Sequence, residues 1–242
     1  MPPIVQEFGD REAMSVAAAA FFAEQAREAV AARGRFLTAL SGGGTPQPTF
    51  ERLGTAPFRD SIPWAKTDIF WSDERLVPPD HDGSNYRQAY DAFLHRLPIP
   101  TPQIHRARGE REPARAVADY IRQLRELAYP ARDGWPIFDL ILLGMGSDGH
   151  TASLFPGPLP AEAARQPVIA VTADYDGRPA HRLTFTPPLI NAARHILFLV
   201  AGAAKQQALH AVLHGPHNPT QWPAQRVQPE HGSVTWMVVP HD

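Results

Sequence analysis

Short apolar segments alternate along the chain with longer amphipathic ones, and the two kinds predict different elements. The short segments are rich in branched and aromatic residues, and they predict strands at 35–40, 67–71, 138–143, 168–172, 182–185, 196–200 and 233–239. The longer segments predict helices at 11–33, 84–97, 112–128 and 203–213, with shorter ones starting at 49 and 187. Strands that alternate with helices indicate an α/β fold with a mostly parallel sheet.

The helix expected at 11–33 has clear signals at both ends. Asp10 suits the N-cap position, and Gly34 suits the residue after the last turn. Between them the chain is rich in alanine, with Glu24 and Glu28 on what we expect to be the exposed side. The inward stripe is predicted to consist of Val16, Ala20, Phe21, Ala23 and Val30.

The stretch Phe138–Gly157 reads FDLILLGMGSDGHTASLFPG and combines a buried strand with a polar turn. Its first six residues are nearly all apolar, which is typical of a strand buried on both faces of a parallel sheet. The turn that follows contains three glycines, and Asp148 and His150 are its ionisable groups. Histidine titrates near neutral pH, so this strand end is the first candidate for catalysis.

Polar clusters follow four of the predicted strands. They are SGGGTP at 41–46, SDER at 72–75, GMGSDGH at 144–150 and AGAAK at 201–205. The carboxyl ends of parallel strands point the same way, and open α/β sheets bind their ligands at that edge. We therefore expect the four clusters to meet there.

The glycine-rich cluster at 41–46 suits a phosphate. Glycines let backbone N–H groups approach an anion, and a helix is expected directly behind them. The cluster lacks the Lys-Ser/Thr pair of a P-loop and does not fit the dinucleotide pattern GxGxxG. A turn without any ligand remains the alternative. Lys205 begins a predicted helix, where it could reach a phosphate or simply lie on the surface.

The cluster at 72–75 offers two carboxylates and a guanidinium. Arg75 could hold an oxyanion, and Asp73 could hold a sugar hydroxyl; a solvated loop with an internal salt bridge is the alternative. His210 and His214 are four residues apart on a predicted helix, a spacing that metal pairs use. No third ligand stands near them in the sequence, so we expect no metal site.

The amino-acid composition excludes several kinds of functional site and partner. The 242 residues carry a net charge of −2 and no cysteine, which excludes disulfides, thiolate nucleophiles and an overall basic field for nucleic acid. The N-terminus shows no secretory signal, and the Ala-rich segment is too charged to span a bilayer. No segment reads as a long linker. We expect one domain over 1–242, located in the cytoplasm.

The clusters together resemble the 6-phosphogluconolactonase and glucosamine-6-phosphate isomerase family. SGGGTP, WSDER, Ser84-Asn85-Tyr86, DGHTASLFPG and GAAK occur in the order and spacing of the lactonases over nearly the whole chain. The resemblance implies a Rossmann-like α/β sandwich and hydrolysis of 6-phospho-D-glucono-1,5-lactone without metal or organic cofactor. It also implies a small-molecule partner. We expect no nucleic-acid or membrane partner, and a monomer or weak homo-oligomer.

The resemblance assigns roles to residues. The implied catalytic group is His150, Asp148, Arg75 and Asp73. The implied substrate-binding and phosphate-binding group is Ser41, Gly42, Gly43, Gly44, Thr45, Asn85, Gly146, Arg182 and Lys205. In this hypothesis His150 is the general base and the glycine loop holds the phosphate.

Two other functions remain open. A deaminase of the same family is expected to carry a glutamate five residues after the histidine, where this chain has Phe155. Arg75 after Asp73-Glu74 also fits the lactonases better. At Gly44 the family is expected to have serine more often, a change that leaves backbone amides free to bind phosphate. A non-catalytic sugar-phosphate-binding module is the third interpretation, although the chain shows no DNA-binding segment.

Overall fold

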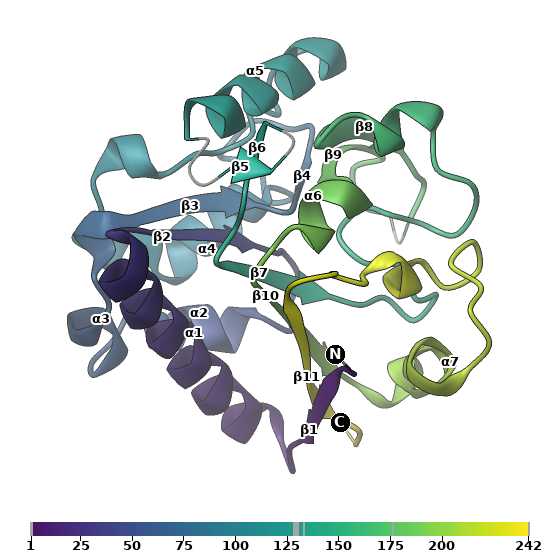
Figure 1. Cartoon of the computed structure of the whole chain (residues 1–242), viewed down its shortest axis with the longest axis horizontal. Helices are drawn as coiled ribbons and strands as arrows, with labels where there is room; N and C mark the ends of the chain where they lie inside the picture. Colours follow the sequence, from purple (N-terminus) through teal and green to yellow (C-terminus); the bar gives the residue numbers. More distant parts are fainter. Residues whose placement is uncertain (1, 128–130, 133, 176, 242) are drawn as a thin grey trace.

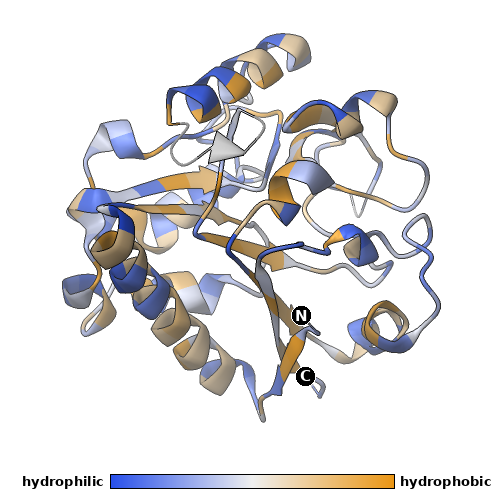
Figure 2. Cartoon of the chain, in the orientation of Figure 1, coloured by the Kyte–Doolittle hydropathy of each residue, from blue (hydrophilic) through white to orange (hydrophobic). Residues whose placement is uncertain are grey.

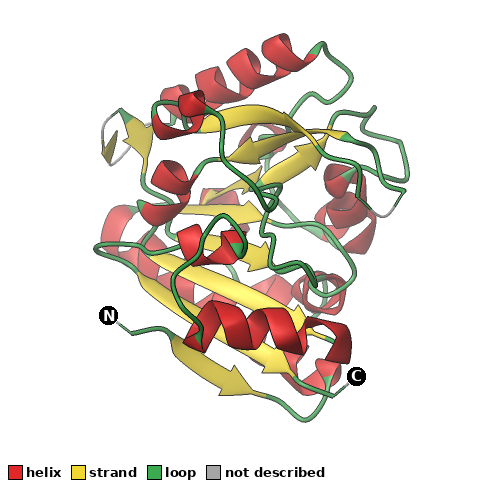
Figure 3. Cartoon of the chain, turned by 90° about the vertical axis from the view of Figure 1, so that its right-hand side faces the viewer, coloured by secondary structure: helices red, strands yellow, loops and turns green. Residues whose placement is uncertain are grey.

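A six-stranded parallel sheet forms the centre of the computed structural model, which describes residues 2–127, 131, 132, 134–175 and 177–241. The strand order is β1-β11-β10-β7-β2-β3, and the arrowheads point to one side of the molecule (Figure 3). The strands are β1 (Ile4–Glu7), β2 (Phe36–Leu40), β3 (Thr67–Trp71), β7 (Leu140–Gly144), β10 (His195–Ala201) and β11 (Ser233–Val239). The predicted fold class is confirmed, and β1 is a strand that the sequence analysis missed.

Helices cover both faces of this sheet (Figures 1 and 2). They are α1 (Arg11–Arg33), α2 (Gln47–Leu53), α3 (Phe58–Ser61), α4 (Asn85–Ala92), α5 (Pro113–Glu126), α6 (Pro187–Asn191) and α7 (Gln206–His214). Short 3-10 helices lie at Trp64–Lys66, Leu94–Arg96, Thr101–Gln103, Ala161–Ala164, Ala203–Lys205 and Pro223–Arg226. On β7, Leu140 and Leu142 pack in the core on the α1 side, and Ile141 and Leu143 pack in the opposite core. Successive side chains of a strand point to opposite faces, so a strand covered on both sides is apolar throughout.

A second, antiparallel sheet continues from the end of β3. It has the order β4-β9-β8, with β4 at Asp73–Arg75, β9 at His181–Phe185 and β8 at Val168–Thr172. Ser72 is the junction, because its N–H donates to Leu40 O (2.8 Å) while its carbonyl accepts from Phe185 N (2.7 Å). The cluster at 72–75 is therefore a buried edge strand, and the solvated-loop interpretation is wrong. A two-residue ladder joins β5 (Ala131–Arg132) and β6 (Trp135–Pro136).

Helix α1 begins and ends where the sequence predicts. Asp10 accepts a hydrogen bond from Ala13 N at 2.7 Å, and Gly34 has a left-handed φ of 78°. The predicted inward stripe is wrong at Val16 and Ala20, which are exposed; Ala23 is buried, and Phe21 and Val30 pack partly buried against the core. The buried positions are Met14, Ser15, Ala18, Ala19, Phe22, Ala23, Gln25, Ala26 and Ala29.

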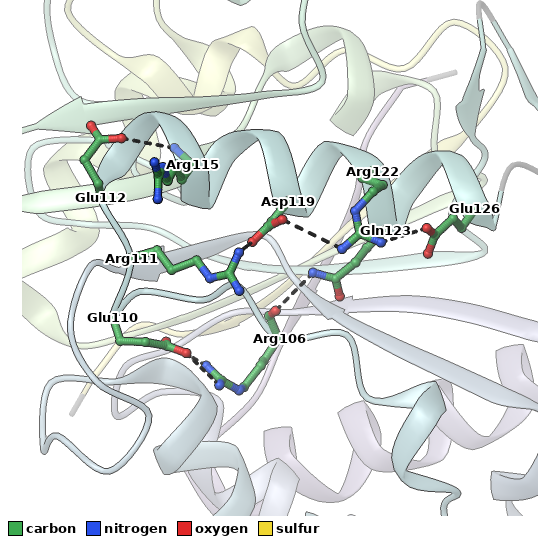
Figure 4. A network of polar contacts seen from close by, with 9 residues as sticks. All are labelled: Arg106, Glu110, Arg111, Glu112, Arg115, Asp119, Arg122, Gln123 and Glu126. Atoms are coloured by element: carbon green, nitrogen blue, oxygen red, sulfur yellow. Dashed lines mark hydrogen bonds and ion pairs between the residues drawn. The ribbon is translucent and has the colours of Figure 1, made fainter.

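Two further helices differ in length from their predictions. Helix α4 stops at Ala92 because Phe93 leaves the helical region, with a φ of −155°. Helix α5 starts one residue after its N-cap Glu112, and its predicted end at 128 lies outside the described residues. The solvent side of α5 carries ion pairs such as Arg122–Glu126 at 2.8 Å (Figure 4).

Candidate functional site

The four polar clusters meet at one edge of the sheet. Strands β10, β7, β2 and β3 are consecutive neighbours, so their carboxyl ends lie side by side. A cavity of about 270 Å³ opens there. Of the residues predicted for the site, it is lined by Ser41, Gly42, Gly43, Gly44, Thr45, Asp73, Arg75, Asn85, Gly146, His150, Arg182 and Lys205. Asp148 does not line the cavity but contacts His150, which does. The expected convergence is confirmed.

His150 and Asp148 form a close pair. The Nδ1 of His150 lies 2.6 Å from Asp148 Oδ1, and the same oxygen accepts from His150 N at 3.1 Å. Burial works to raise the pKa of the Asp148 carboxyl, but the hydrogen bonds and charge of His150 outweigh it and hold this pKa below its ordinary value. An ionised Asp148 selects the tautomer with a proton on Nδ1, which leaves Nε2 as the basic nitrogen.

Gly146 makes room for this pair. A Cβ on Gly146 would lie 2.2 Å from His150 Nδ1 and 2.6 Å from Asp148 Oδ1. Both distances are shorter than side-chain contacts allow, so a larger residue would displace the pair. The glycine at this position is therefore required by the close approach of the imidazole.

Aromatic rings enclose the imidazole. The rings of Phe155 and Tyr175 each lie 4.7 Å from that of His150, measured between centroids. The guanidinium of Arg182 lies over the ring of Phe155, 5.1 Å from the ring centre. Phe155 thus brings an apolar surface, and no carboxylate, next to His150.

Four cationic side chains line the same cavity. Arg75 and Arg182 lie directly opposite each other on β4 and β9, and Arg178 and Lys205 complete the group. Burial lowers the pKa of Arg182, which Asp73 works to raise and Arg75 and Arg178 lower further. The pKa of Lys205 is also lowered, by burial first and then by Arg11 and Arg178. Like charges opposite each other on paired strands are unfavourable, so this group indicates a site for an anion.

Several buried polar atoms at the cavity have no hydrogen-bond partner among the described residues. They are Ser41 Oγ, Arg75 Nε, Asn85 Oδ1 and Arg182 Nη2. Buried polar atoms are nearly always paired in native proteins, because leaving one unpaired costs about 1–3 kcal/mol. The unpaired atoms comprise donors and acceptors, as a ligand with several oxygens and hydroxyls requires.

The glycine loop is shaped by its neighbours from α4. A Cβ on Gly42 would lie 1.8 Å from Asn85 Oδ1, so only glycine lets the loop pass there. Gly43 N donates to Gln88 Oε1 at 2.9 Å, and Gln88 Nε2 donates back to Gly43 O at 2.7 Å. The amide of Gly43 is therefore already engaged by Gln88.

Asp73 is held in place at the cavity wall. Its Oδ2 accepts from Ser153 Oγ at 2.7 Å, and its carbonyl accepts from Asn85 Nδ2 at 2.8 Å. The next residue, Glu74, turns the other way and binds the start of α4. Burial raises the pKa of Glu74 to about 7, against the lowering effect of three backbone N–H groups.

The structure adds two residues that the sequence analysis missed. Tyr175 and Arg178 lie in the connection between β8 and β9 and reach the cavity wall. Their segment has no glycine cluster and follows no strand of the central sheet, so no sequence signal marked it. Only the antiparallel pairing of β8 with β9 brings this connection over the site.

Neither a metal-binding cluster nor a membrane-spanning helix is found among the described residues. The rings of His210 and His214 are 5.3 Å apart on α7, yet the described residues contain no group of three or more His, Asp or Glu side chains that could hold a metal ion. Within the same described residues, no helix is both long enough and apolar enough to cross a bilayer.

Comparisons with known proteins agree with this geometry. Residues 9–236 match the family model of glucosamine-6-phosphate isomerases/6-phosphogluconolactonase. A 6-phosphogluconolactonase of Synechocystis is 44% identical over 212 residues, covering 87% of this chain and 85% of the relative. The 6-phosphogluconolactonase structure from Thermotoga maritima has a TM-score of 0.82 at 27% identity, covering 98% of this chain and 99% of the other.

A monomeric glucosamine-6-phosphate deaminase has the same fold. Its TM-score is 0.81 at 21% identity, with 97% of this chain and 96% of the other covered. The fold is thus shared by both activities, and the side chains of the site must separate them. With its family-model match over nearly its whole length, the chain belongs to the glucosamine-6-phosphate isomerase/6-phosphogluconolactonase family.

Proposed function

We propose that this chain is a 6-phosphogluconolactonase, which hydrolyses 6-phospho-D-glucono-1,5-lactone to 6-phospho-D-gluconate in the oxidative pentose phosphate pathway. The names of the similar proteins support this activity. The single observation that carries it is the His150–Asp148 pair at a cavity lined by arginines and a lysine. A histidine–aspartate pair beside a cationic cavity suits an uncharged ester on an anionic sugar phosphate.

The reaction begins with a water molecule that attacks the lactone carbonyl carbon. His150 takes a proton from this water as the new C–O bond forms, and Asp148 stabilises the resulting imidazolium. Arg75 binds the negative charge that develops on the carbonyl oxygen. When the tetrahedral intermediate collapses, the bond from the carbonyl carbon to the ring oxygen breaks, and His150 returns its proton to that oxygen.

The rest of the cavity positions the substrate. The amides of Gly42, Gly44 and Thr45 hold the phosphate together with Lys205 and Arg182. Arginine and lysine form charge-assisted hydrogen bonds to phosphate oxygens, which are about twice as strong as neutral ones. Ser41, Asp73, Asn85 and Gly146 also line the cavity, and in this proposal they bind the sugar hydroxyls.

The deaminase alternative is disfavoured by one contact. Phe155 packs on the imidazole of His150, at the position where a deaminase is expected to carry its glutamate. An apolar ring there offers no carboxylate for ring opening. A binding module without catalysis would not require the paired His150 and Asp148.

One assay separates these functions. The purified protein is given the lactone, generated in situ from glucose 6-phosphate, and the hydrolysis rate is compared with the spontaneous rate. In parallel, ammonia release from glucosamine 6-phosphate is measured. We expect fast lactone hydrolysis and no ammonia. Ammonia release would establish the deaminase, and the absence of both activities with retained sugar-phosphate binding would establish the module.

We further propose one domain over 1–242, since strands of the central sheet come from both ends of the chain. A monomer or weak homo-oligomer, the lack of a nucleic-acid partner and a cytoplasmic location stay predictions from the sequence. Gel filtration with light scattering tests the oligomeric state.

A further inference from the structure

We propose that Glu74, which does not line the cavity, is a positioning residue that holds Asn85 and Arg75 against the substrate. The proposal rests on the lactonase function proposed above, because its effect is measured on the lactone reaction. It concerns a residue between two groups of the site, Asp73 and Arg75, on strand β4.

The direction of each side chain on β4 follows from strand geometry. Successive residues of a strand point to opposite sides, so Asp73 and Arg75 share one side and Glu74 takes the other. Asp73 and Arg75 both line the cavity. Glu74 instead contacts the first residues of α4, and only 2% of it is exposed to solvent.

Both oxygens of Glu74 are fully used. Oε1 accepts from the backbone N–H of Asn85 (2.7 Å) and of Arg75 (2.8 Å). Oε2 accepts from Tyr86 N (2.8 Å) and from Ser84 Oγ (3.2 Å). Every one of these partners donates, so the arrangement matches the ionised carboxylate, the form present above its pKa of about 7. The start of a helix favours negative charge there. The carboxylate thereby ties strand β4 to helix α4.

The residues tied in this way carry unpaired polar atoms of the cavity. Asn85 Nδ2 donates to Asp73 O, which fixes the amide orientation, and Asn85 Oδ1 is left buried and unpaired. Arg75 Nη1 donates to Gly83 O at 2.7 Å, and Arg75 Nε is left unpaired. Both atoms are set by backbone positions that Glu74 holds. We therefore infer that binding and oxyanion stabilisation depend on this carboxylate.

The test compares Glu74→Gln and Glu74→Asp with the wild type. In Glu74→Gln an NH2 group replaces one oxygen and faces a donor instead of accepting from it. In Glu74→Asp the charge remains, but the shorter side chain cannot reach all four donors. The matched control is Glu126→Gln, whose carboxylate is exposed on α5 and pairs with Arg122 (Figure 4).

We expect kcat/KM to fall by about 10-fold to 100-fold in Glu74→Gln, as for the loss of a buried charged hydrogen bond. Part of this loss is a higher KM, because a displaced Asn85 binds the substrate less well. The rest is a lower kcat, because a displaced Arg75 stabilises the oxyanion less well. Glu74→Asp shows a smaller loss of the same kind, and Glu126→Gln keeps wild-type kinetics. A structural role alone would lower the melting temperature without this change in the kinetics of the folded enzyme.

A double-mutant cycle gives the decisive readout. If Glu74 acts partly through Asn85, the KM effect of Glu74→Asp is largely absent in an Asn85→Ala background. Effects on KM that multiply independently would overturn the proposal, as would wild-type kcat and KM in a folded Glu74→Gln. Should Glu74→Gln fail to fold, the Glu74→Asp arm and its cycle decide alone.

Failure of the positioning role of Glu74 can be distinguished from failure of the proposed lactonase function. If the wild type does not hydrolyse the lactone, the function is refuted, and binding of 6-phosphogluconate by calorimetry replaces the kinetic readout. Weaker binding in Glu74→Asp than in Glu126→Gln then still supports the positioning role. Equal binding in the two variants overturns it.

Discussion

Replacing Gly146 with alanine tests whether the His150–Asp148 pair must keep its present geometry. The added Cβ would lie 2.2 Å from His150 Nδ1 and 2.6 Å from Asp148 Oδ1. Gly146 does not have a positive φ, so alanine fits its backbone without strain. The three atoms nearest to the added Cβ all belong to these two side chains, which makes the substitution selective for the pair.

The size of the effect follows from the required movement. Ordinary contact for a Cβ begins near 3.4 Å, so the imidazole must move by about 1 Å, and a misplacement of that size costs about 100-fold in rate. The 2.6 Å hydrogen bond to Asp148 cannot survive such a shift without both groups moving. We therefore expect kcat of Gly146→Ala to fall about 100-fold, near the lower limit of general base catalysis.

The assay measures lactone hydrolysis above the spontaneous rate. Gly9→Ala is the control, because a Cβ on Gly9 meets no atom within 4 Å and Gly9 lies outside the site. Thermal unfolding of both variants should match the wild type to within a few degrees. A Gly146→Ala enzyme with wild-type kcat would refute the reasoning, since it would mean that the pair tolerates displacement or takes no part in catalysis.

Three further predictions concern single groups. His150→Ala should lose about 10²–10⁴ in kcat while it still binds 6-phosphogluconate; near wild-type kcat would remove His150 from the mechanism. Lys205→Ala should chiefly raise KM, since an anchor for phosphate binds substrate and transition state equally, and a collapse of kcat at unchanged KM would contradict that role. Burial raises the pKa of Glu74 from 4.5 to about 7, so its contribution to the free energy of unfolding is full below pH 4.5 and lost as pH rises through 7. Urea unfolding should show that the wild type loses about 3 kcal/mol more than Glu74→Gln between pH 4.5 and 8, and equal slopes would contradict the raised pKa.

Helix α1 shows how local and tertiary information differ. Its two ends were predicted correctly, because an aspartate cap and a left-handed glycine act within a few residues of the chain. Its buried face was predicted only in part, with Ala23 inside as expected but Val16 outside and Met14 inside. Alanines occupy all sides of this helix, so the hydrophobicity of its residues hardly distinguishes one face from another. Contact with the sheet selects the side that is buried.

The candidate site also combines features that local sequence signals predicted with features that only tertiary packing produced. The sequence placed His150, the glycine loop, Arg75 and Lys205 at strand ends that do lie side by side, because parallel strands end at one edge. It did not reveal that 73–75 forms a strand of a second sheet, since its partner β9 follows more than 100 residues later. Nor did it reveal Tyr175 and Arg178, which reach the cavity through that same sheet.

The sequence by itself determined the parallel α/β architecture, the candidate general base and the anion-binding edge. These rest on short motifs and strand order, which act locally or through a general rule of sheet geometry. Only the tertiary structure decided which oxygen, amide and ring each group faces: Asp148 on His150, Gln88 on the amide of Gly43, and Phe155 on the imidazole. Such contacts join residues from separate elements, and their distances depend on how the two sheets and their helices pack.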